Sequence, residues 1–142
     1  MKTEEQAYLA GIIDGEGSIW IERPPRGTTF VLLLVVANTD PRLMVWLAPL
    51  GGSVTERHQN KPTHKPGMLW RISGKRAVGI IREIYPFLKL KKEQATIALA
   101  YWDLHGRYHV KAGSRNKKPF VEEASVLKEA MSVLNKKGNQ QG

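Results

Sequence analysis

The chain has 142 residues, a length at which one compact domain is usual. Twenty-two Lys and Arg against 13 Asp and Glu give it a formal net charge of +9. Cysteine is absent, which excludes disulfides, thiolate metal sites and a cysteine nucleophile.

The positive charge is spread unevenly along the chain. Residues 1–17 carry one Lys and four acids, a net charge of −3, so residues 18–142 carry a net charge of +12. A strongly basic balance favours a polyanionic partner, and nucleic acid is the usual one. The alternative is a soluble protein that is merely basic.

The amino-terminal residues argue against export and against a membrane anchor. Residues 1–5 are polar and acidic, where a signal peptide would need a basic start and an apolar run. The longest apolar stretch, residues 30–37, has the length of a strand and not of a membrane span. We therefore expect a soluble, cytoplasmic protein, or an organellar one if an organelle encodes it, with no membrane partner.

The first predicted helix has a capping-box pattern at its start, Thr3 followed by Gln6, and glycines at its end. On a 3.6-residue period its large apolar residues fall on one side and can cover a sheet. The other side is nearly bare and consists of Ala7, Ala10, Gly11 and Asp14. Two such helices could pack closely through their small residues. Glu16 is expected just past the helix end.

Strands and helices then alternate along the chain. The patterns predict strands at residues 18–23, 28–37, 53–59 and 67–73. They predict further helices at residues 40–50, 74–84, 92–104 and 121–136. The second helix has Asp40 as N-cap and Pro41 at its first position. The fold class is therefore α+β, with a four-stranded antiparallel sheet, helices on one face, and an open second face.

The run Tyr8-Leu9-Ala10-Gly11-Ile12-Ile13-Asp14-Gly15-Glu16-Gly17 resembles the LAGLIDADG motif of homing endonucleases. The expected element order also matches the αββαββα core of that family, over about residues 3–104. The match implies one endonuclease domain, which we place at residues 1–136. Its helical extension at 105–136 rests on a generic helical pattern, and the polar residues 137–142 are expected to be a disordered tail. Because the motif occurs once, the resemblance implies a homodimer that pairs through the small side of the first helix.

The resemblance also implies a set of site residues. Glu16 matches the family's metal-binding acid, with the backbone carbonyl of Gly15 as a second ligand, and the implied cofactor is Mg²⁺ or another divalent cation. Asn38 matches a polar position at the end of the second strand, and Arg42 follows near enough to assist. Lys91, in the segment Pro86-Phe87-Leu88-Lys89-Leu90-Lys91, matches a lysine near the attacked phosphate.

Each of these residues also has a structural interpretation. Asn38 and Arg42 could be cap or turn residues, and Lys89 and Lys91 could be a solvated pair or simple phosphate contacts. We expect Asp14, the earlier acid of the motif, to be structural.

Base reading is assigned to the open sheet face, because a two-stranded ribbon fits the major groove. Alternation places these residues outward: Trp20, Glu22, Thr29, Val31, Leu33, Val35, Thr55, Arg57, Gln59, Leu69, Arg71 and Ser73. Further expected DNA contacts are Ser18, Arg23, Arg26, Lys89 and His109. Arg57 and Arg71 are the best candidates for guanine readers. The second strand is apolar on both faces, so Val31, Leu33 and Val35 contact thymine methyls or the strand register is slipped.

His105 and His109 have the spacing of a zinc pair, but Gly106 is expected to break the helix between them. Without a nearby acid or cysteine, a phosphate-contacting loop is the better interpretation.

The leading hypothesis is an intron-encoded or free-standing, Mg²⁺-dependent endonuclease that cuts both strands of a long pseudo-palindromic DNA target as a homodimer. The alternative is a DNA-binding regulator of the same fold that does not cleave, or a maturase that binds intron RNA. The acid at Glu16 argues for cleavage, and an assay with and without Mg²⁺ separates the two.

Overall fold

The computed structural model describes residues 1–23, 29–57, 67–110 and 117–140. Four strands form one antiparallel sheet in the order β1-β2-β4-β3. Their bounds are Gly17–Glu22 for β1, Val31–Asn38 for β2, Ser53–Arg57 for β3 and Gly67–Ser73 for β4. The two hairpins therefore meet at the central pair β2 and β4, which confirms the α+β class.

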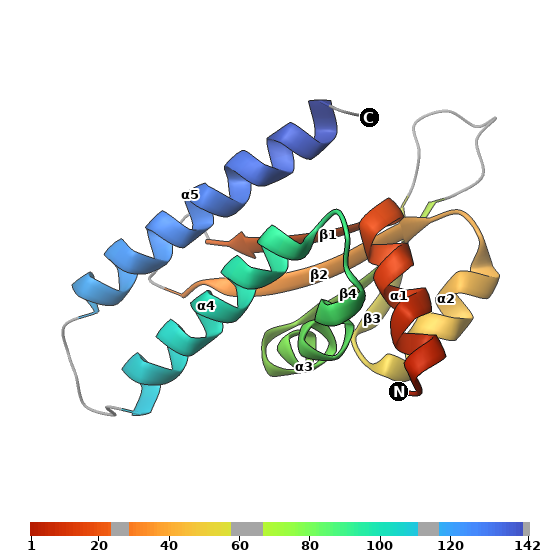
Figure 1. The fold of residues 1–142 in the computed structure, drawn as a ribbon, viewed down its shortest axis with the longest axis horizontal. Helices are drawn as coiled ribbons and strands as arrows, with labels where there is room; N and C mark the ends of the chain where they lie inside the picture. Colours follow the sequence, from red (N-terminus) through yellow and green to blue (C-terminus); the bar gives the residue numbers. More distant parts are fainter. Residues whose placement is uncertain (24–28, 58–66, 111–116, 141–142) are drawn as a thin grey trace.

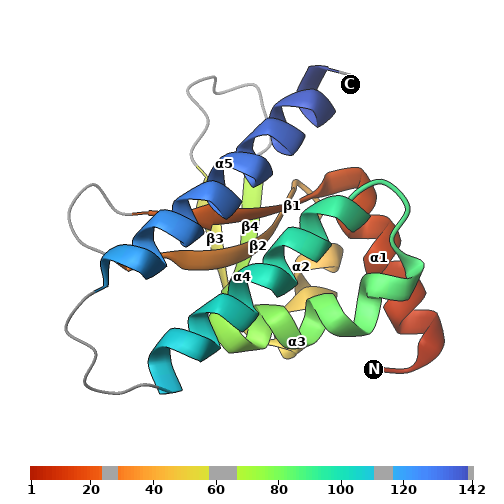
Figure 2. The ribbon, with the colours of Figure 1, turned by 60° about the vertical axis from the view of Figure 1, so that its left-hand side comes forward.

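Helices cover one face of this sheet and leave the other open (Figures 1 and 2). They are α1 (Thr3–Glu16), α2 (Pro41–Leu47), α3 (Gly74–Ile84), α4 (Lys92–Val110) and α5 (Lys118–Gln140), with short 3-10 turns at Ala48–Leu50 and Tyr85–Phe87. α1 and α3 pack on the inner face, and α5 lies against α4 and β1. Among the described residues no helix is both long and apolar enough to cross a bilayer.

One hydrophobic core joins these layers. It contains Leu9 and Ile13 from α1, alternate residues of β1 and β2, and the buried side of α3. Tyr101 from α4 and Met131 from α5 extend the core into the layer where these two helices pack on each other and on β1. The burial of alternate strand residues on this side is what leaves their neighbours for the open face.

The first helix differs in detail from expectation. It begins after Lys2, whose backbone N–H donates to the Glu5 side chain at 3.3 Å, so the predicted pairing of Thr3 with Gln6 is wrong by one residue. It continues through Gly15, and Glu16 is its last residue. A Cβ on Gly17 would lie 2.7 Å from the Ile13 Cα, so a close approach of the chain requires glycine where helix becomes strand.

The C-terminal helices are longer than predicted. α4 passes through Gly106, which was expected to break it, and α5 is helical to Gln140, where a disordered tail was expected from residue 137. Leu104 is buried, and the ring of Tyr108 on α4 lies against that of Phe120 on α5 with centroids 5.5 Å apart. This packing against α5 offsets the roughly 1 kcal/mol that a glycine costs in a helix.

Candidate functional site

The motif acid lies at the end of α1 and is bound by the end of β2. Asn38 Nδ2 donates a hydrogen bond to Glu16 Oε2, although the two residues are 22 positions apart in sequence. Glu16 is exposed and Asn38 is half-buried. The structure thus brings together two of the predicted site residues, and the amide holds one carboxylate oxygen in place.

A chain of hydrogen bonds continues from Asn38 into α2. The Asp40 backbone N–H donates to Asn38 Oδ1 at 2.8 Å, and Asp40 in turn accepts from the Arg42 backbone N–H at 2.9 Å as the N-cap of α2. Arg42 turns its guanidinium to Asp40, with Nη2 at 2.7 Å from Oδ2. The side-chain hydrogen bond and charge of Asp40 raise the pKa of Arg42. Arg42 is therefore paired with the cap and not with Glu16.

The basic segment before α4 lies against the last turn of α1. The Asp14 carboxylate accepts the backbone N–H groups of Lys89, Leu90 and Lys91 at 2.7, 3.1 and 2.9 Å. Lys91 Nζ donates to the Asp14 carbonyl oxygen at 2.9 Å. Lys91 is therefore fixed to Asp14, the residue two positions before Glu16, and Asp14 binds the whole segment.

A hollow of about 610 Å³ opens beside the acid. It is lined by exposed residues of α1, by the end of β2 and by the start of α2: Ala7, Tyr8, Gly11, Ile12, Gly15, Glu16, Asn38, Asp40 and Leu43. Ala7, Gly11 and Gly15 follow one another at a spacing of four, so they form a stripe without bulk along the helix. A second backbone could approach closely here.

The composition of this stripe corrects the predicted small side of α1. Ala7 and Gly11 are exposed as expected, but Ala10 is fully buried in the core. Asp14 is engaged with the segment before α4. Gly15, which was expected to end the helix, takes their place on the exposed side. Because the helix runs on through Gly15 and ends at Glu16, Gly15 continues its exposed side.

The open face of the sheet carries those predicted outward residues that lie within the four described strands. Cross-strand pairs such as Trp20 with Leu33, Val35 with Arg71, and Thr55 with Leu69 place these residues on one face, so the slip considered for the second strand has not occurred. Leu33 and Val35 are nevertheless only 0% and 4% exposed. They do not present their side chains to a ligand in this conformation.

An ion pair explains part of this burial. Arg71 Nη2 lies 3.3 Å from Glu22 Oε2. Glu22 is on β1 and Arg71 is on β4, so the pair crosses over β2 on the open face. Glu22 is opposite Val31 and Arg71 is opposite Val35, which places the crossing over Leu33.

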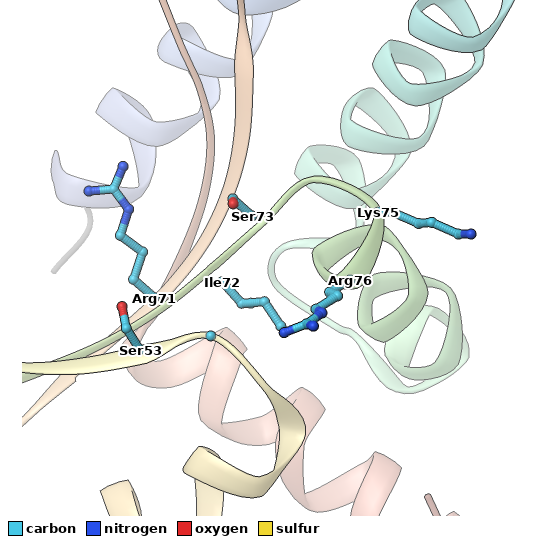
Figure 3. A pocket seen from close by; sticks show the side chains of 7 residues that line it. Ser53, Arg71, Ile72, Ser73, Lys75 and Arg76 are labelled. Atoms are coloured by element: carbon cyan, nitrogen blue, oxygen red, sulfur yellow. The ribbon is translucent and has the colours of Figure 1, made fainter.

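A second, basic hollow of about 400 Å³ lies where β4 leads into α3 (Figure 3). Its charged residues are Arg71, Lys75 and Arg76. In Figure 3 Arg71 and Lys75 point to opposite sides, so the three cations do not converge on one point. Lys75 and Arg76 were not singled out from the sequence, although two adjacent basic residues at the start of a helix are visible there.

Solved structures resemble this arrangement. The homing endonuclease I-CvuI, in complex with its target and in the presence of Ca, matches with a TM-score of 0.69 and 21% identity, over 93% of this chain and 82% of that chain. The archaeal intron-encoded homing endonuclease I-Vdi141I, complexed with DNA, has a TM-score of 0.71 and 11% identity over 92% and 84%. The LAGLIDADG homing endonuclease I-GzeII, in complex with a DNA target, has a TM-score of 0.67 and 14% identity.

The chain has the LAGLIDADG homing endonuclease fold. It covers 43% of the I-GzeII chain, so that protein is more than twice as long as the matching part. No protein-family model matches the chain, and no curated protein matches it in sequence.

On the LAGLIDADG fold most of the remaining predicted residues belong to the strands or their ends, whereas Lys89 is in the segment bound to Asp14. Exposed or half-buried positions are occupied by Ser18, Trp20, Glu22, Arg23, Thr29, Val31, Thr55, Arg57, Leu69, Arg71, Ser73 and Lys89. Arg23 lies over the Phe30 ring at 5.4 Å. Arg26, Gln59 and the side chain of His109 lie outside the described residues. Within the described residues no three His, Asp or Glu side chains gather as a metal site.

Proposed function

We propose that the chain is a divalent-metal-dependent, site-specific endonuclease that cleaves both strands of DNA as a homodimer. The observation that carries this proposal is the position of Glu16. An exposed carboxylate ends the motif helix, is held by Asn38, and faces the hollow beside the small-residue stripe. The DNA complexes of proteins with the same fold support the substrate class.

The donor set at this point suits a hard divalent cation. Mg²⁺ is usually bound by one or two carboxylates together with substrate phosphates and water, and Glu16 supplies one exposed carboxylate. Once bound there, the metal would polarise the phosphate and activate water. Glu16 would hold it, and the Asn38 amide would keep the carboxylate in its orientation.

One chain supplies one such carboxylate, so cutting two strands requires a second copy of the chain. The sequence carries the motif, and with it this acid, once, whereas cutting both strands requires a site at each scissile phosphate. A two-fold axis along the stripe of Ala7, Gly11 and Gly15 would bring two Glu16 residues together, one from each protomer. The DNA would then lie along two open sheet faces related by that axis.

Cleavage-site selection from a randomised DNA library, with and without Mg²⁺, tests this proposal. The selection reports activity, target symmetry and overhang together. We expect Mg²⁺-dependent cleavage within a pseudo-palindromic sequence. Binding of DNA without cleavage by the wild-type protein would favour the regulator instead.

Glu16→Gln tests the acid directly on the selected target. The variant should bind DNA about as well as the wild type but lose cleavage, because it removes the charge and keeps the size. Glu122→Gln, which makes the same change on the exposed side of α5, is the matched control. Cleavage by Glu16→Gln within about tenfold of wild type would contradict a metal-binding role.

A further inference from the structure

The carboxylate of Asp14 closes around the backbone before α4. It accepts three consecutive N–H groups, from Lys89, Leu90 and Lys91, which are 75 to 77 positions away in the sequence. Three such residues in a bend have no helix or strand to satisfy their N–H groups. The shape of this segment therefore depends on one carboxylate.

A second contact ties the same two elements together. Lys91 Nζ donates to the backbone carbonyl oxygen of Asp14, in the last turn of α1. The carbonyls of a last turn have no intrahelical partner, and a cation there also interacts favourably with the helix dipole. Lys91 thus contributes both its backbone N–H and its ammonium group to Asp14. Its side chain is half-buried at this position.

These contacts determine where the Lys91 ammonium lies relative to the Glu16 carboxylate. Lys91 Nζ binds a carbonyl oxygen of the last turn of α1, and the free carbonyls of a last turn point toward the end of the helix, where Glu16 is the final residue. The Lys91 ammonium would otherwise sit at the end of a flexible four-carbon stem in an irregular segment. Its neighbour Leu90 is 74% exposed and contributes little packing to hold the segment.

We infer that Asp14 is a positioning residue for strand cleavage: it shapes the segment Lys89–Lys91 and thereby places the Lys91 ammonium next to the metal-binding acid. This inference rests on the proposed function, and it assigns Asp14 a role beyond the helix interface at which the sequence placed it. Asp14 touches no substrate in this scheme. Its effect on the reaction passes through Lys91.

The test compares Asp14→Asn, Lys91→Met and the double variant on the selected DNA target. Asp14→Asn keeps the size of the side chain but weakens its acceptance of the three N–H groups. We expect its single-turnover rate to fall about 10- to 100-fold, because small misplacements of a catalytic group have effects of that size. DNA affinity should change by less than about threefold. Asp103→Asn, the same change at an exposed position of α4, should leave both quantities unaltered.

The double variant distinguishes positioning from general destabilisation. If Asp14 acts through Lys91, then Asp14→Asn should add less than about a threefold loss when Lys91 is already Met. Multiplication of the two single effects would overturn the inference and indicate a structural role. An Asp14→Asn rate equal to that of wild type would overturn it as well.

Two further outcomes keep the inference separate from the proposed function. A wild-type protein that binds but does not cleave the target overturns the proposed function itself, whereas a normal rate in Asp14→Asn overturns only the inference. If Asp14→Asn folds poorly, hydrogen exchange of the Lys89, Leu90 and Lys91 amides in the wild-type protein provides the test. We expect them to be protected, and exchange at the rate of an open loop would overturn the anchoring.

Discussion

Gly11 gives the sharpest test of the proposed homodimer, because it is exposed in the single chain and central to the stripe of small residues. A Cβ built at Gly11 meets no heavy atom within 4 Å. A side chain at this exposed position therefore starts into open space within one protomer. Leu is also a better helix former than Gly, so the change should stabilise an isolated protomer by about 0.5–1 kcal/mol.

The effect on a dimer should have the opposite sign. Helices that meet through small residues lie at the short end of the 8–10 Å range, where no room remains for a Leu side chain. Overpacking costs about 1–3 kcal/mol for each insertion, and a two-fold axis brings two Leu residues into one interface. The dimer should therefore weaken by about 2–6 kcal/mol, which raises its dissociation constant about 30-fold or more.

Gly79 offers a matched control on α3. It is also helical and exposed, and a Cβ built there meets nothing within 4 Å. Sedimentation of wild type, Gly11→Leu and Gly79→Leu over a range of concentrations measures the dissociation constants. Only Gly11→Leu should shift toward monomer, and DNA cleavage should fail with it. An unchanged dimer in Gly11→Leu would refute the interface, and an equal shift in both variants would refute the reasoning from the stripe.

Two other predictions concern the open face and the core. Arg57→Ala and Arg71→Ala should each relax specificity at one base position per half-site, at a cost of about 1–3 kcal/mol, as measured by binding-site profiles. Equal weakening on all sequences would mean that the arginine contacts only phosphate. Burial raises the pKa of Tyr101 to about 12 from the usual 10, so the unfolded chain loses this proton first as the pH rises. Stability should therefore fall between about pH 10 and 12, by up to about 2–3 kcal/mol. Chemical unfolding of wild type and Tyr101→Phe across this range isolates the effect, and identical pH dependence in both would contradict it.

The Tyr101→Phe variant should also be less stable at neutral pH. Tyr101 Oη donates to the Phe30 carbonyl oxygen at 3.1 Å, and both groups are buried. Loss of the donor leaves that carbonyl without this partner, which costs about 1–3 kcal/mol. The pH effect is therefore measured as the change in the free energy of unfolding between about pH 10 and 12 within each protein, and not as the difference in stability between the two proteins.

Local signals in the sequence determined most of the secondary structure. Asp40 followed by Pro41 begins α2 as predicted, because a side-chain cap and a fixed φ act on neighbouring residues. The bounds of β4 and α3 also agree, since Gly74 has a positive φ of 64° at the point where strand becomes helix. Alternation likewise assigned the two faces of β1 and β4, whereas β2 is apolar on both faces.

Long-range packing decided what those signals could not. The sequence shows which residues of α1 are small, and the helical period predicts which of them share a side. Only the tertiary structure shows that Ala10 is in the core and that Gly15 is exposed. α4 crosses Gly106 because its burial against α5 outweighs the local preference of one glycine.

At the open face and at the site, too, the sequence identifies residues whereas long-range packing determines their contacts. Leu33 is buried although it lies on the open side, and an ion pair between β1 and β4 crosses the strand at this point. The motif identified Glu16 as the acid, whereas its contact with Asn38 joins residues 22 positions apart. The Asp14 contacts span 75 to 77 positions. Such contacts depend on how the elements pack, and no local pattern of residues determines them.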